Sequence, residues 1–148
     1  MYGLFSIPFF SRSQMNSKEK SLILRACVSV ACADGDMSTG EIETLKSSAA
    51  DFGGFHAGDI DKAIAENKGL DAVLLQDLKA LPPQKAHVLL KSVFLISNAD
   101  GNITEHELAS IKKISDVVMP GKPWSVVHQW IGSYKTFVDA TRTLFAEN

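Results

Sequence analysis

One short acidic element occurs twice in this chain, and it limits the possible folds more than any other feature. Stretches of helical periodicity lie before and after each copy, and few stretches alternate as strands do. We therefore expect an all-α domain in which each copy joins two helices. The copies are Asp34-Gly35-Asp36-Met37-Ser38-Thr39-Gly40-Glu41 and Asp100-Gly101-Asn102-Ile103-Thr104-Glu105-His106-Glu107.

The two copies lie 66 positions apart, and the similarity extends into the flanking helices. Identical residues at this offset include the alanine before each element and a lysine in the helix that follows it (Ala33/Ala99, Lys46/Lys112). Repeat one covers about 18–53 and repeat two about 84–119. Two copies are too few for a solenoid, so we expect a compact domain with pseudo-twofold symmetry.

Glycines, prolines and capping patterns divide the chain into about seven helices. The helices beginning at Asn16 and Gln84 are apolar nearly all round, which places them in the middle of the fold. The last helix, at about 124–146, is amphipathic and is either continuous or broken at Gly132. The expected ranges are about 16–34, 38–52, 59–67, 71–81, 84–100, 104–118 and 124–146, within a single domain at 16–148.

Residues 1–15 form a separate N-terminal segment that is rich in large apolar side chains. It lacks the basic start of a signal peptide, and it is too short to span a bilayer. We expect a strap packed on the domain, with contact to a membrane surface or partner as the alternative. Its apolar residues are Leu4, Phe5, Ile7, Phe9 and Phe10.

The net charge and the two cysteines indicate which binding partners and which cellular compartment to expect. The net charge of −2 and the pI near 6.1 argue against nucleic-acid binding. Cys27 and Cys32 point away from each other on a helix, so we expect two buried thiols and no disulfide between them. Reduced thiols indicate a cytoplasmic protein, with peripheral membrane association as the alternative.

Helix capping explains part of the acidic element without any ligand. Ser38 with Glu41, and Thr104 with Glu107, have the spacing of capping boxes, and the glycine ends the preceding helix. Asp34 and Asp100 are not explained in this way. Each follows a helix C-terminus, where the helix dipole disfavours a carboxylate by roughly 0.3–1 kcal/mol.

A bound cation would make each aspartate favourable at its position, although hydrogen bonds from the next helix's amides are an alternative. Carboxylates, hydroxyls and carbonyls suit Ca²⁺, Mg²⁺ or Mn²⁺. An EF-hand is not indicated, because its glycine at position 6 and glutamate at position 12 are missing. The candidate ligands are Asp34, Asp36, Glu41, Asp100, Asn102 and Glu107.

The doubled pattern Ala-Asp-Gly-x-hydrophobic-Ser/Thr-x-x-Glu between helices resembles the TerB-like domain of tellurite-resistance proteins, which also precedes the J domain in DjlA-type cochaperones. The resemblance covers about 18–118. It implies an all-α fold that brings both loops toward one surface, with a metal-chelating role for Asp34, Glu41, Asp100 and Glu107. Asp36 and Asn102 are added from the spacing. The implied setting is a stress response to tellurite, linked to membrane-associated complexes.

The leading hypothesis is therefore a non-enzymatic module that binds divalent cations and protein partners. The alternative is a protein-interacting helical scaffold in which the loops are only caps. An apolar groove near Trp124 to Phe137 would then bind the partner, although the spacing of these aromatic residues equally suits a core. A small enzyme would need a deep pocket with convergent titratable groups. The sequence leaves the oligomeric state open.

Overall fold

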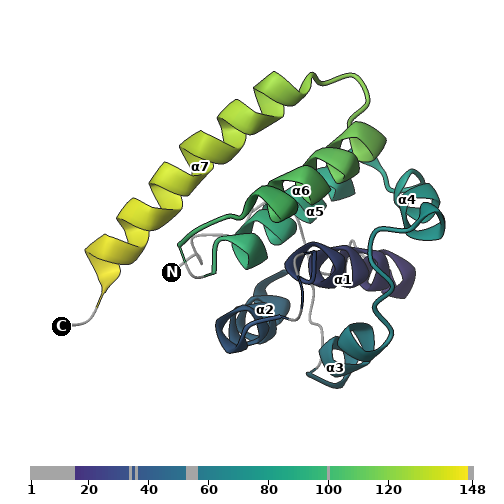
Figure 1. Cartoon of the computed structure of the whole chain (residues 1–148), viewed down its shortest axis with the longest axis horizontal. Coiled ribbons are helices and arrows are strands. Elements are labelled where there is room, and N and C mark those ends of the chain that lie inside the picture. The colour runs from purple at the N-terminus through teal and green to yellow at the C-terminus, as the bar shows by residue number, and fades with distance from the viewer. Residues whose placement is uncertain (1–15, 34, 36, 53–56, 100, 147–148) are drawn as a thin grey trace.

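The computed structural model describes residues 16–33, 35, 37–52, 57–99 and 101–146 (Figure 1). Within these residues the chain forms seven α-helices and no strand, which confirms the all-α prediction. The helices are α1 (Ser17–Ala31), α2 (Thr39–Phe52), α3 (Ala57–Ala65), α4 (Ala72–Leu78), α5 (Pro83–Ser97), α6 (Glu105–Val118) and α7 (Trp124–Phe145).

The helices α1 and α5 form the centre of the domain, as their apolar sequences predict. They pack against each other, and their buried residues face every direction around the helix. Phe94 on α5 and Val28 on α1 are fully buried. Burying such a side chain stabilises the fold by about 1.5–3 kcal/mol.

The other five helices surround this pair. The helices α2 and α3 lie on one side, α4 and α6 contact each other, and α7 runs along the outer side of α6 (Figure 1). His87 near the start of α5 lines the same cavity as Val126 near the start of α7. Asn98 at the end of α5 donates to Asp139 in a later turn of α7. The two helices therefore run in the same direction.

Both central helices are followed by a glycine with positive φ that makes the same backbone hydrogen bond. The amide of Gly35 donates to the carbonyl of Cys32 at 3.1 Å, and that of Gly101 donates to Asn98 at 3.0 Å. The φ angles of Gly35 and Gly101 are +139° and +89°. Residues that carry a side chain rarely adopt such positive φ angles, which explains why glycine occupies both positions.

Two details differ from the expectations. The last helix is continuous, and Gly132 lies exposed within it with open space where a side chain would project, so it is not a break or a close approach. Both cysteines are present as thiols, but only Cys27 is fully buried, and burial raises the pKa of its thiol to about 12. Cys32 is only partly buried, because it caps the exposed end of α1.

Candidate functional site

Both acidic elements contain the predicted capping boxes. At the start of α2, the amide of Ser38 donates to Glu41 Oε1 at 2.8 Å, and the amide of Glu41 donates to Ser38 Oγ at 3.1 Å. At the start of α6, Thr104 and Glu107 make the same two bonds at 2.9 and 3.1 Å. One oxygen of each glutamate is therefore used by its cap.

The two capping glutamates also contact each other, although they are 66 positions apart in the sequence. The carboxyl group of Glu41 lies close enough to that of Glu107 to raise its pKa. Only 3% of Glu107 is exposed, whereas Glu41 is partly buried. The starts of α2 and α6 therefore meet at one place, where two carboxyl groups face each other.

The electrostatics of this pair are unusual for surface carboxylates. The pKa of Glu107 is raised to about 7: burial is the largest cause and the nearby Glu41 carboxyl adds to it, while the bonds of Glu107 with Thr104 act in the opposite direction. A buried carboxyl group beside a second one is disfavoured in its charged form. Glu107 therefore holds its proton at a pH where isolated glutamates have lost theirs.

Oxygen donors of this kind suit a hard divalent cation, which can replace the proton that Glu107 holds. The described residues supply two such ligands, Glu41 and Glu107. Among the described part of the chain, no three His, Cys, Asp or Glu side chains form a cluster that could hold a metal ion. Asn102 is exposed. Asp34, Asp36 and Asp100 lie outside the described residues.

A second polar cluster fastens α7 to the second acidic loop. The ammonium of Lys135 donates to the carbonyl of Gly101 at 2.7 Å, to Asn98 Oδ1 at 3.1 Å and to Asp139 Oδ2 at 2.6 Å. Arg142 donates to the carbonyl of Asn98 at 2.9 Å, and Asn98 Nδ2 donates to Asp139 at 3.1 Å. We call these four residues, Asn98, Lys135, Asp139 and Arg142, the α7 latch.

Sequence reasoning missed the α7 latch. Only the four-residue spacing of Lys135 and Asp139 marks an ion pair on a helix. The latch places cationic groups on the C-terminal carbonyls of α5, where the helix dipole favours positive charge. The pKa of Asp139 lies below its usual range, and the hydrogen bond from the ammonium of Lys135 is the largest cause.

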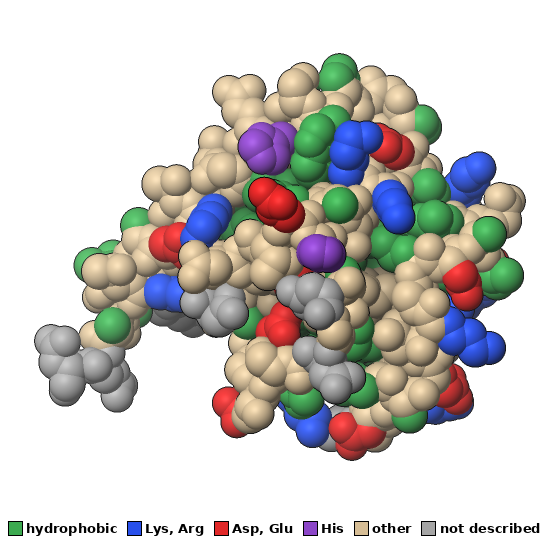
Figure 2. Space-filling model, in the orientation of Figure 1, with side chains coloured by type: hydrophobic (Ala, Val, Ile, Leu, Met, Phe, Trp, Pro, Cys, Tyr) green, Lys and Arg blue, Asp and Glu red, His purple; other side chains and the backbone are tan. Residues whose placement is uncertain are grey.

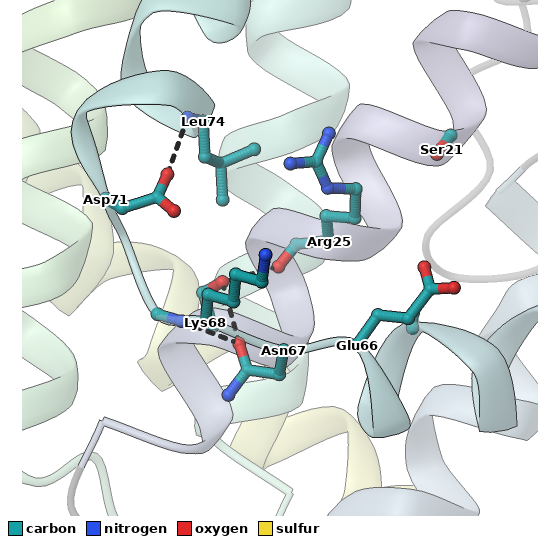
Figure 3. Close-up of a pocket in the computed structure, with 10 residues that line it drawn as sticks. Ser21, Arg25, Glu66, Asn67, Lys68, Asp71 and Leu74 are labelled. Atoms are coloured by element: carbon teal, nitrogen blue, oxygen red, sulfur yellow. Dashed lines mark hydrogen bonds between the residues drawn. The ribbon is translucent and has the colours of Figure 1, made fainter.

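A polar pocket lies elsewhere, between α1 and the segment that joins α3 to α4 (Figure 3). It has a volume of about 390 Å³. Figure 3 shows Arg25 of α1 and Asp71 before α4 on opposite sides of it. Asp71 caps α4 through the amide of Leu74 at 2.8 Å, and Asn67 accepts from the amide of Gly69 at 3.1 Å. These polar groups thus make bonds that shape the local backbone.

The aromatic residues of α7 divide between core and surface. Trp130 and Tyr134 stack on each other and pack against Phe94 of α5, with centroid distances of 6.4 and 4.9 Å to that ring. Phe137 is 52% exposed. Trp124 also packs against the core, so the spacing predicted core packing correctly for three of these side chains and not for Phe137.

Neither the surface charge nor the comparisons with known proteins indicate another functional site. Acidic and basic side chains are interspersed over the face shown in Figure 2, without a broad region of one sign. Within the described ranges, no helix is long and apolar enough to cross a membrane. Protein-family models, curated proteins and solved structures gave no significant match to this chain.

Proposed function

We propose that this domain binds a divalent cation where its two acidic loops meet, with Glu41 and Glu107 as ligands. The observation that supports the proposal is the close approach of the Glu41 carboxyl group to that of Glu107, which is almost fully buried. Each glutamate keeps one oxygen outside its capping bond. A cation between these oxygens would remove the like-charge repulsion that otherwise favours the protonated form of Glu107.

The biological role that we propose is that of a TerB-like module in the response to tellurite and related stress. The doubled motif and the all-α fold of seven helices support this role. In this role the protein is a non-enzymatic, cytoplasmic partner of other proteins, including membrane-associated complexes. The aspartates Asp34, Asp36 and Asp100, together with Asn102, belong to the proposed ligand set on sequence grounds alone.

Calorimetric titration of chelator-treated protein with Ca²⁺, Mg²⁺ and Mn²⁺ tests the cation proposal. We expect binding with release of up to one proton per site near neutral pH, because the cation displaces the proton of Glu107. The released proton is measured by repeating the titration in buffers of different ionisation enthalpy. No heat, together with no rise in melting temperature at millimolar metal, would contradict the proposal.

Variants separate the ligands from the surroundings. The double change Glu41→Gln with Glu107→Gln keeps the acceptor oxygens for both caps and should abolish binding. Glu105→Gln is the matched control, since this exposed carboxylate lies in the same turn and should leave the affinity unchanged. Asp34→Asn with Asp100→Asn tests the aspartates that the sequence motif indicates.

A second candidate function is a protein-interaction scaffold in which the loops are only caps. The observation in its favour is the exposure of large apolar side chains on α7, where Phe137 is 52% and Leu144 is 75% exposed. This hypothesis predicts normal partner binding by the Glu41→Gln, Glu107→Gln variant. Loss of a partner with Phe137→Ser and Leu144→Ser would favour it over the cation site.

A further inference from the structure

We propose that the N-terminal segment, residues 1–15, binds back onto its own domain in an apolar cavity between α5, α6 and α7. This inference does not depend on the cation site, which lies at the starts of α2 and α6. The proposal states which part of the chain fills the apolar cavity that α5, α6 and α7 leave uncovered.

The cavity has the size and chemistry of a site for large apolar side chains. Its volume is about 270 Å³, and it lies at the end of the domain where α5 and α7 begin. Val126, which forms part of its wall, remains 51% exposed. The lining consists of His87, Leu90, Met119, Lys122, Val126, Val127 and Trp130.

Two polar groups next to the cavity indicate that an extended backbone lies against them. The hydroxyl of Tyr134, one turn after Trp130, is buried without a hydrogen-bond partner in the described structure. The ammonium of Lys91 lies 5.4 Å from the centre of the Tyr134 ring, and burial lowers its pKa. Both groups are donors, and the backbone carbonyls of an extended segment can accept hydrogen bonds from them.

The position of α1 brings the segment to this end of the domain. Glu19, in the first turn of α1, accepts a hydrogen bond from Lys85 Nζ at 3.0 Å, and both side chains are largely buried. Lys85 precedes His87 of the cavity by two residues, which is about 3 Å along a helix axis. Fifteen residues can extend by up to about 50 Å, so the segment reaches the cavity easily.

The segment also matches the cavity in chemistry. Residues 1–11 contain no charged side chain, and five of the first ten are Leu, Ile or Phe. Pro8 lacks an amide hydrogen and restricts its neighbour to an extended conformation, which suits a strap more than a helix. Phe9 and Phe10 are the bulkiest neighbouring pair, and we assign the cavity to them.

Paramagnetic relaxation in the full-length chain tests this assignment. A nitroxide is attached at Ser6→Cys in a Cys32→Ser background, where Cys27 is too deeply buried to react. We expect broadened methyl signals for Leu90, Val126 and Val127, unchanged on tenfold dilution. The methyl signals of Leu144, 75% exposed near the far end of α7, should stay sharp and serve as the internal reference.

Each remaining outcome decides the question. With Phe9→Ser and Phe10→Ser added, the broadening should disappear, whereas Leu144→Ser at the far end of α7 should leave it unchanged. Absence of broadening in the parent protein overturns the proposal. Broadening that fades on dilution also overturns it, because the segment then binds a second copy of the chain.

Discussion

The two acidic loops share a local structure but differ in what surrounds them. Each follows a central helix, turns at a glycine with positive φ and opens the next helix with a capping box. Only at the second loop do the described residues include a latch from α7, where Lys135 and Arg142 donate to the carbonyls of Gly101 and Asn98. The position in the first copy that corresponds to Asn98 is Cys32.

This difference shows which properties are local and which depend on the rest of the fold. Capping bonds connect residues three apart, so both copies form them wherever the sequence repeats. Burial and charge depend on distant neighbours, so Glu107 is 3% exposed while Glu41 is only partly buried. The two loops therefore have similar sequences but different surroundings: Glu107 is more deeply buried than Glu41, and within the described residues only the second loop is bound by the α7 latch.

Removal of the α7 latch should cause a large loss of stability that is specific to the second loop. Lys135→Met removes the donor to the carbonyl of Gly101 and leaves Asp139 with the bond from Asn98 but without its ion pair, which should lower the free energy of unfolding by about 1–3 kcal/mol. Urea denaturation measures this loss. Lys112→Met is the matched control, because Lys112 and Asp116 form an exposed pair of the same spacing, worth at most about 1 kcal/mol. Equal losses in both variants would falsify the latch as a special feature.

The caps should show a smaller difference between the loops. Thr104→Ala removes an acceptor for the part-buried amide of Glu107, and we expect a loss of about 1–2 kcal/mol. Ser38→Ala removes the corresponding bond in an exposed setting, so the loss should be about 0.5–1 kcal/mol. Thermal and urea unfolding of both variants measure the two losses. A larger loss for Ser38→Ala would contradict the assigned burial of the second loop.

A further expected effect is the dependence of stability on pH. The pKa of Glu107 is about 7 in the folded protein and near 4.5 when unfolded, so between these values the folded state binds the extra proton. Stability from this group is therefore greatest below about pH 4.5 and decreases as pH rises to about 7. Urea midpoints measured across this range in metal-free buffer should reveal the decrease.

Two glutamine variants sharpen this test. Glu107→Gln should remove the contribution of the group to the decrease. Glu41→Gln should remove only part of it, because burial of Glu107 is the first cause of the raised pKa and Glu41 a lesser one. If Glu41→Gln removes the whole dependence, repulsion between the two carboxylates outweighs burial.

Much of the fold follows from the sequence, because helix ends and central helices have local signals. Glycine at positions 35 and 101 and the serine or threonine caps mark helix ends, and the all-round apolar residues of α1 and α5 mark the centre. The first helix nevertheless ends at Ala31 and the fourth at Leu78, about three residues before the expected ends, where no strong stop signal occurs.

The candidate site was predictable only in part. The motif resemblance indicated that the loops approach each other, but no spacing along the chain shows that Glu41 and Glu107 touch or that Glu107 is buried. The latch was invisible for the same reason, since Lys135 lies 34 residues from the carbonyl that it binds. Tertiary contacts between α7 and the end of α5 create both its geometry and its charge balance.

The unequal burial of the Cys27 and Cys32 thiols allows local and global unfolding of this domain to be measured separately. A thiol-specific reagent should modify Cys32 in the native protein, at a rate that reflects exposure at the first loop. Cys27 is 2% exposed in the middle of α1, so its modification must wait until the core separates. The two labelling rates in one molecule therefore distinguish fraying at a helix end from global unfolding.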